Sequence, residues 1–174
     1  MHQRHDFRNH FILNTLSIGL LFVGVTAQPA MVMLDGNPET PGISPVPRSV
    51  IAGEKLLVGI SVERAVNVHS YSVKISYDPA IVTFEGAAAK LSPLTPAFLE
   101  TGGGKIAAFL AVPGKESVEI AATLTGKNSS VCASGNGILG YLSFSAKTGG
   151  DPRIVVTEAR LVDPDAKNTF AEIP

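Results

Sequence analysis

Histidine and cysteine, the side chains that most often bind metals or assist nucleophiles, are almost absent from most of this chain. Three of the four histidines, His2, His5 and His10, stand near the start, and the chain after residue 27 carries only His69 and Cys132. A zinc-type site needs several such ligands close together. The sequence therefore predicts no histidine- or cysteine-based metal centre, and calcium, which prefers oxygen ligands, is the one cofactor left open.

No set of catalytic groups stands out among the remaining polar residues. His69 is the only histidine after residue 27, and on a strand its neighbour Ser70 would point to the opposite face. Glutamates suited to glycoside hydrolysis are present, but their spacing singles out no pair. They are Glu63, Glu85, Glu100, Glu116, Glu119 and Glu158. We predict that the chain is not an enzyme.

The segment 163–168 spaces oxygen-bearing side chains as a calcium loop can. An EF-hand would need Gly and Glu where this chain has Asn168 and Pro174, so that loop type is excluded. A looser calcium site on Asp163, Asp165 and Asn168 is one interpretation, and a hydrogen-bonded turn is the other.

Gly135, Gly137 and Gly140 match the string of the dinucleotide-binding fingerprint. That fingerprint works only between a strand and a helix whose N-terminus meets the pyrophosphate. The following residues, 141–147, alternate polar and apolar as a strand does. We therefore interpret the glycines as residues of a turn and of close strand packing.

The charge balance argues against nucleic acid as a partner. The chain has 14 Lys and Arg against 15 Asp and Glu, a net charge of −1. Binding to a phosphate backbone depends on a basic surface, and this composition supplies no basic excess.

Residues 1–27 have the pattern of a secretory signal peptide. Arg4 and Arg8 precede an uncharged apolar stretch at 11–25, and Val25-Thr26-Ala27 supplies small residues for cleavage. The stretch is shorter than the roughly 20 residues that span a bilayer as a helix. We expect a secreted or extracytoplasmic protein (periplasm or cell surface) without a stable membrane span after cleavage. A retained anchor is the alternative.

The rest of the chain divides into a linker and one domain. Residues 28–48 contain five prolines. Proline fixes φ and removes an amide donor, so this segment is predicted to be an extended linker. The domain is expected over residues 49–174.

Period-two patterns dominate this domain. Strands are predicted at 56–63, 70–78, 105–112, 117–124, 138–147 and 154–161. No long stretch keeps a helical apolar stripe, and residues 81–90 are expected to hold at most one short turn of helix. Short strands separated by Gly and Pro turns predict an all-β sandwich.

Several short motifs recur in a fixed order along this domain. They are Gly53-Glu54, the Tyr71–Pro79 segment that ends in Tyr-Asp-Pro, the pair Val82 and Phe84, the glycine-rich strand Gly135–Lys147, Gly149-Gly150, and Leu161 with Asp163. In this order, Val50–Ile173 resembles a bacterial cohesin domain, the dockerin-binding module of cellulosomes. The resemblance implies a nine-stranded jelly-roll β-sandwich, related in fold to several carbohydrate-binding modules.

The resemblance also implies a binding surface. In cohesins that bind dockerin, one flat sheet face makes the contact, including outward positions on the strand before the aspartate–proline corner. In this chain those positions are Ser70, Ser72, Lys74 and Ser76. A second strand, placed by the resemblance in the same sheet, adds Ser143, Ser145 and Lys147. Well-known members carry Asn and Asp near the first two positions, so the hydroxyls here depart from the usual dockerin hydrogen-bond pattern. A serine-rich face fits the close approach of a partner's helix, and it equally fits an ordinary solvated face.

Three functions are compatible with these patterns. The first is an exported, non-catalytic cohesin-type module that recognises a protein partner such as a dockerin. The second is a carbohydrate-binding module acting in polysaccharide binding or degradation, for which the chain offers no Trp and only Tyr141 as an outward aromatic on a strand. The third is a structural subunit of an envelope or secretion assembly.

Overall fold

The computed structural model describes residues 28–174, so the predicted signal peptide lies outside the described residues. Nine strands account for most of this part of the chain: β1 Met31–Asp35, β2 Lys55–Val68, β3 Ser70–Ser76, β4 Val82–Ala88, β5 Ile106–Pro113, β6 Ser117–Leu124, β7 Ala133–Ala146, β8 Val155–Val162 and β9 Asn168–Phe170. Two short 3₁₀ helices, η1 (Phe98–Gly102) and η2 (Ser129–Val131), lie between strands. No helix within 28–174 has the length and apolar character needed to cross a membrane.

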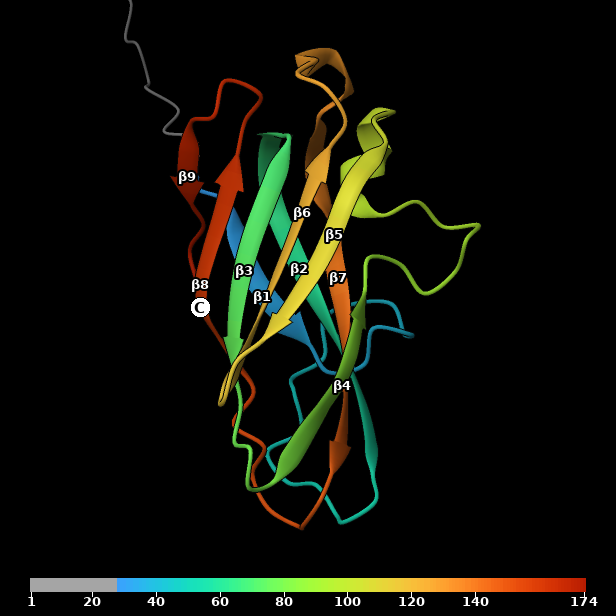
Figure 1. Cartoon of the computed structure of the whole chain (residues 1–174), viewed down its shortest axis with the longest axis vertical. Helices are drawn as coiled ribbons and strands as arrows, with labels where there is room; N and C mark the ends of the chain where they lie inside the picture. Colours follow the sequence, from blue (N-terminus) through green and yellow to red (C-terminus); the bar gives the residue numbers. More distant parts are fainter. Residues whose placement is uncertain (1–27) are drawn as a thin grey trace, which may run out of the picture.

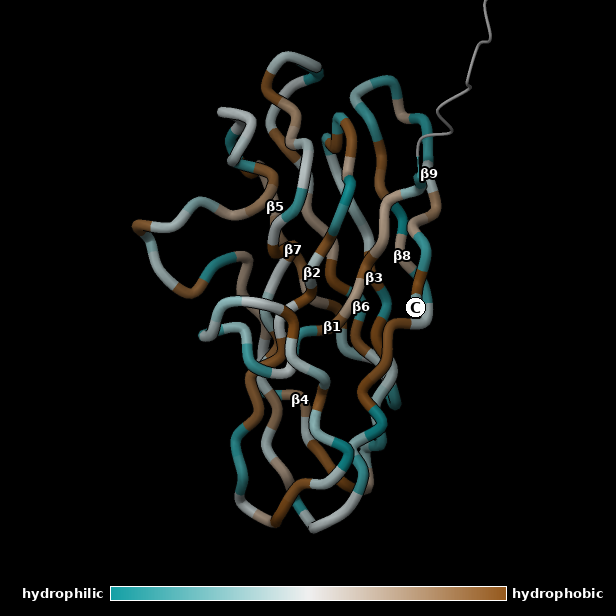
Figure 2. The backbone as a smooth tube through the Cα atoms, turned by 180° about the vertical axis from the view of Figure 1, so that it is seen from behind, coloured by the Kyte–Doolittle hydropathy of each residue, from teal (hydrophilic) through white to brown (hydrophobic). Residues whose placement is uncertain are grey.

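The strands form two antiparallel sheets packed face to face. One sheet has the order β1-β2-β7-β4 and the other β5-β6-β3-β8-β9. Figure 1 is seen from the side of the five-stranded sheet, and Figure 2 from the side of the four-stranded sheet. The predicted all-β sandwich of nine strands is confirmed.

The core lies between the sheets because alternate residues of each strand point inward. In β3, Tyr71, Val73 and Ile75 are buried, as the alternation predicts. Phe144 of β7 is fully buried, and its ring meets the rings of Tyr77 and Phe84 edge to face at centroid distances of 5.3 and 5.8 Å.

One hydrogen bond links the two sheets through this core. The hydroxyl of Tyr71, on β3, donates to the carbonyl oxygen of Leu139, on β7. Burial raises the pKa of the Tyr71 phenol far above its usual value, because the charged form would lose its hydration. Tyr71 is therefore both a core residue and a link between the sheets.

The prediction of an extended linker over 28–48 is wrong for Met31–Asp35. This segment is strand β1, which pairs antiparallel with β2, and Val32 is fully buried. The prolines lie before and after the strand rather than within it, so they do not interrupt its ladder. The domain therefore begins before residue 49.

The segment 81–90 contains no helix, within the limit of one short turn that the sequence set, but it holds a strand that the sequence did not predict. Val82–Ala88 is strand β4, which pairs with β7 and has a bulge between Phe84 and Gly86. The bulge interrupts the two-residue period that would have marked the strand in the sequence.

The three fingerprint glycines lie within strand β7, so no helix follows them. Gly137 faces Phe98, and a Cβ there would lie 2.7 Å from that ring. A Cβ on Gly140 would lie 3.1 Å from the side chain of Ile120. Gly135 has a φ of 99°, which L side chains rarely adopt. The interpretation of close strand packing is confirmed for Gly137 and Gly140, whereas the predicted turn is wrong because all three glycines lie inside β7.

Candidate functional site

The seven predicted contact residues do not share one surface. Ser70, Ser72, Lys74 and Ser76 lie on β3, in the five-stranded sheet, whereas Ser143, Ser145 and Lys147 lie on or directly after β7, in the four-stranded sheet. The expectation that both strands share a sheet is wrong. β3 pairs with β6 and β8, while β7 pairs with β2 and β4. The two sets therefore face opposite sides of the sandwich.

We call the outer side of the five-stranded sheet the serine face. Its residues lie in four cross-strand rows: Ala108, Thr123, Ser70, Val162 and Asn168; Leu110, Ala121, Ser72, Arg160 and Phe170; Val112, Glu119, Lys74 and Glu158; and Ser117, Ser76 and Val155. The β3 positions predicted from the sequence form the centre of these rows.

Small side chains make the centre of the serine face low and flat. Ser72 lies directly between Ala121 and Arg160, and its hydroxyl donates to the carboxylate of Glu119. Ser72, Lys74, Glu119, Glu158 and Arg160 line part of a hollow of about 480 Å³. The small side chains of Ser70, Ser72 and Ala121 leave a low floor beside the longer side chains of the hollow, so a partner's main chain could approach the sheet there.

Charged groups of both signs surround the floor. Lys74 lies between Glu119 and Glu158 in the strand register, and it makes no ion pair with any group in residues 28–174. Glu158 instead pairs with Arg160, whose guanidinium carbon lies 5.2 Å from the centre of the Phe170 ring. Arg160 is thus already paired, and Lys74 is the cation on this face that a partner's carboxylate could engage.

The β5 side of the serine face is apolar. Leu110 is 59% exposed and Val112 is 62% exposed. No sequence motif marks these residues, although the alternation in Ile106–Pro113 places them on one side of that strand. They give the face an apolar rim beside its polar centre.

The outer face of the four-stranded sheet is different because a loop covers part of it. The loop between β1 and β2 packs on Gly59, where a Cβ would lie 2.9 Å from Cβ of Pro38. Asp35 holds this loop, since its buried carboxylate accepts hydrogen bonds from the amides of Asn37 and Ser44, both at 3.0 Å. Figure 2 shows the molecule from this side.

The predicted residues on this second face are the outward ones near the end of β7. Ser143 is exposed, and the Ser145 hydroxyl donates to the carboxylate of Glu85 on β4. Lys147 is exposed after the strand ends. They are separated from the serine face by the whole thickness of the sandwich.

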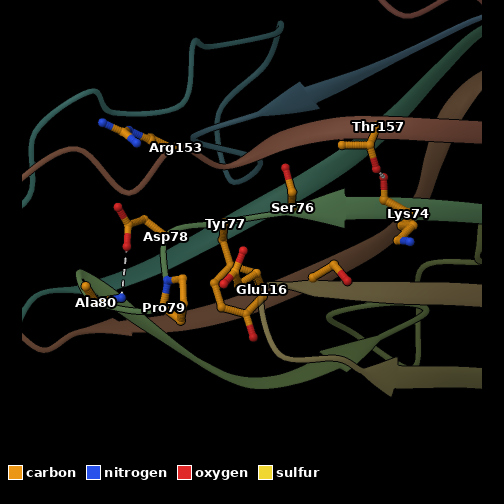
Figure 3. A pocket seen from close by; sticks show the side chains of 10 residues that line it. Lys74, Ser76, Tyr77, Asp78, Pro79, Ala80, Glu116, Arg153 and Thr157 are labelled. Atoms are coloured by element: carbon orange, nitrogen blue, oxygen red, sulfur yellow. Dashed lines mark hydrogen bonds between the residues drawn. The ribbon is translucent and has the colours of Figure 1, made fainter.

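The aspartate–proline corner borders a larger hollow at one end of the sandwich, of about 740 Å³ (Figure 3). Asp78 accepts a hydrogen bond from the Ala80 amide at 2.9 Å, while Tyr77 packs against the core. Both contacts stabilise the fold, since one closes the turn and the other fills the core. Arg153 and Glu116, which the sequence did not single out, also line the hollow.

The predicted calcium residues form a turn. The Asp163 carboxylate accepts the amides of Asp165 at 3.0 Å and Lys167 at 2.8 Å, and Asn168 begins β9. Within residues 28–174 no cluster of three His, Cys, Asp or Glu side chains is placed to hold a metal. The hydrogen bonds are those of the second interpretation, an Asx-type turn.

Tyr141 does not form an open aromatic platform. Its side chain is half-buried beneath the loop that follows β4, in a hollow lined also by Leu91, Pro96 and Phe98. Burial, and secondarily the negative charge of Asp35, raises the pKa of its phenol.

Comparison by sequence finds no relative: no protein-family model and no curated protein matches the chain. Comparison by structure finds cohesin modules. A non-cellulosomal cohesin from the archaeon Archaeoglobus fulgidus is 14% identical and superposes with a TM-score of 0.53, over 82% of this chain and 83% of that one. The second type II cohesin module of the Acetivibrio cellulolyticus scaffoldin ScaA is 12% identical, with a TM-score of 0.60 over 86% and 96%.

A third structure contains a partner. The Coh-OlpC–Doc435 cohesin–dockerin complex of Clostridium thermocellum includes a chain that is 13% identical, with a TM-score of 0.59 over 86% of this chain and 92% of that one. At such identities the likeness concerns the fold. The domain described here therefore has the cohesin-type fold.

Proposed function

We propose that this chain is an exported, non-catalytic module that binds a protein partner of dockerin type through the serine face. The observation that carries the proposal is that the two outer faces of the sandwich differ in exposure. The serine face is open, whereas the loop between β1 and β2 covers part of the opposite face. Cohesins of the same fold have been crystallised with dockerins, among them Coh-OlpC of Clostridium thermocellum and the sixth cohesin of scaffoldin B of Acetivibrio cellulolyticus.

The chemistry of the serine face suits a protein ligand. Its floor of Ser70, Ser72 and Ala121 offers hydroxyls to a partner's polar groups and space for a closely packed helix. Leu110 and Val112 supply exposed apolar surface of the kind that interfaces bury in their core. Lys74 offers a charge to an acidic group of the partner.

Export is part of the proposal and is supported by the leader-like pattern of residues 1–27. Fractionation of cells that express the full chain should recover it outside the cytoplasm. Mass spectrometry of the recovered product should then find Gln28 at its N-terminus. A full-length product in the cytoplasm would contradict this part alone.

The binding proposal is tested by titrating the exported product against a panel of purified dockerins in a calorimeter. We expect at least one dockerin to bind at micromolar concentration or below. Ser72→Arg, which places a long charged side chain on the floor, should weaken that binding by about 100-fold, the size of an interface hot spot. Ser143→Arg is the matched control on the opposite face and should leave binding unchanged.

Two results would overturn the proposal. One is the absence of binding to every dockerin of the panel. The other is equal loss of binding in Ser72→Arg and Ser143→Arg, because the serine face would then not be the contact surface. Circular dichroism of both variants checks that each substitution, made at an outward position, leaves the sandwich folded.

A further inference from the structure

The edge strand β5 differs from the other edges of the sandwich. It runs along one side of the five-stranded sheet in Figure 1, where it pairs only with β6. Within residues 28–174, no hydrogen bond from outside the sheet reaches Ile106–Pro113. Its register irregularity lies between Ile106 and Ala108 and its proline is the last residue, so the stretch Ala108–Val112 is regular and contains no charged residue.

The remaining edges carry the usual protections against pairing. The β1 edge is covered by the C-terminal segment, because Val32 donates to the Glu172 carbonyl at 2.9 Å and Glu172 donates to the Ala30 carbonyl at 2.8 Å. β4 has a bulge and the exposed Glu85, and β9 is only three residues long. Bulges, charges, short length and cover are the devices that keep natural edges from pairing with other chains.

The main-chain groups that β5 leaves open can be assigned from its register. Gly114 donates to the Ser117 carbonyl at 2.7 Å, which marks that pair as hydrogen-bonded. Alternation along the ladder makes Val112, Leu110 and Ala108 the residues bonded to β6. The N–H and C=O groups of Phe109 and Ala111 therefore point away from the sheet, toward the solvent edge.

We propose that β5 pairs with β5 of a second copy of this chain, antiparallel about a two-fold axis at Leu110. In that register Phe109 and Ala111 of opposite copies exchange their free N–H and C=O groups. Their side chains also complement each other in size, since each Phe109 faces the other copy's Ala111 and each Val112 faces its Ala108. A strand that is complementary to itself in this way fits a closed two-fold dimer.

The same register explains why the occupant is a copy rather than an unrelated strand. The two Leu110 side chains meet at the axis and, with Val112, shield on the outer face the apolar surface that each copy exposes alone. The nearest charges on the β5 chain segment, Lys105 and Lys115-Glu116, lie beyond the paired residues, and Glu119 beside Val112 belongs to β6. The product is one continuous sheet of ten strands with both serine faces on the same side.

Sedimentation velocity of the exported product, over a concentration series up to about 1 mM, tests the dimer. We expect the apparent mass to rise toward twice that of the monomer. Ala111→Pro removes an N–H that points only to the free edge, and proline is tolerated there. The symmetric dimer then loses this hydrogen bond twice, and each loss weakens association by about a factor of five, so dimerisation should weaken by roughly 25-fold.

A second variant keeps the proposal testable if Ala111→Pro does not fold. Leu110→Lys places two like charges at the axis and should weaken the dimer at least as much, while Val66→Lys is the control. Val66 is 78% exposed and lies near Leu161 and Thr169, away from β5. A monomer at every concentration would overturn the proposal, as would a dimer that Ala111→Pro and Leu110→Lys leave as tight as Val66→Lys does. Dockerin binding by Ala111→Pro is measured separately, since the two proposals can fail independently.

Discussion

The two outer faces of the sandwich consist of similar antiparallel strands and nevertheless differ in what covers them. On the four-stranded sheet, the loop after β1 packs on Gly59, and Asp35 and Ser61 are buried at 3% and 5% exposure. On the five-stranded sheet, the serine face carries no such loop, and Lys74 and Glu119 are exposed. The outer face of the four-stranded sheet is partly used for packing within the domain, whereas the serine face is exposed to solvent.

The difference follows from what each face presents to water. Hydroxyl and charged groups on the serine face are solvated well, so leaving them exposed costs little free energy. The covered face has a glycine at its centre and depends on one buried carboxylate, which accepts two amide hydrogen bonds and so fixes the loop. Cover therefore needs a specific anchor, whereas the polar centre of the serine face can stay open without one.

The sharpest test of this contrast is Asp35→Ala against Glu119→Ala. Removing Asp35 leaves two loop amides without their charged acceptor, and should lower the free energy of unfolding by about 3 kcal/mol. Removing Glu119, an exposed carboxylate, should change it by less than about 0.5 kcal/mol. Urea denaturation of both variants measures the difference, and equal losses would show that the two faces do not differ in this way.

Sequence patterns anticipated which residues point inward but not which strands are neighbours. The alternation in β3 and β7 correctly placed Tyr71 and Phe144 in the core, because burial of one strand face imposes a period of two. Periodicity carries no information about strand partners, and the family resemblance, which supplied them instead, placed Ser143 and Ser145 in the wrong sheet. Long-range pairing decides that assignment.

The sequence did not predict strand β1 or the exposed apolar residues of β5, and the reasons differ. The five residues of β1 are too few to show alternation and stand among prolines, so composition suggested a linker. Leu110 and Val112 lie in a predicted strand, but an edge position, which exposes them, is known only once the sheet order is known. The corner at Asp78 could be predicted because its hydrogen bond is local.

A smaller effect on stability tests the hydrogen bond that links the two sheets. Tyr71→Phe keeps the ring in the core but leaves the buried Leu139 carbonyl without its donor, which should cost about 1–2 kcal/mol of unfolding free energy. Tyr141→Phe, on the covered face, is the matched control because no protein hydrogen bond to its hydroxyl is seen within residues 28–174. Tyr141→Phe should lower the unfolding free energy less than Tyr71→Phe does, and thermal unfolding of the two variants measures the difference.

The same tyrosine gives the stability a pH dependence at the alkaline end. Burial raises the pKa of Tyr71 in the folded state above the value of about 10 in the unfolded chain. Its contribution is therefore complete below pH 10 and is lost as the pH rises from there toward the folded-state pKa. The unfolding free energy should fall more steeply above pH 10 in the wild type than in Tyr71→Phe. Parallel slopes would contradict the assigned burial.

The smallest expected effect on stability is that of Lys74→Ala, and it bears on the openness of the serine face. Lys74 lies between Glu119 and Glu158, which are two strand spacings apart, about 10 Å, so their repulsion is largely screened at physiological salt. Because the ammonium is exposed and makes no ion pair within residues 28–174, its loss should change the free energy of unfolding by less than about 0.5 kcal/mol. Urea denaturation at low and high salt measures this. A clear loss of stability that salt abolishes would mean that Lys74 already serves the fold by holding the two carboxylates together, and the serine face would then have no cation to spare for a partner.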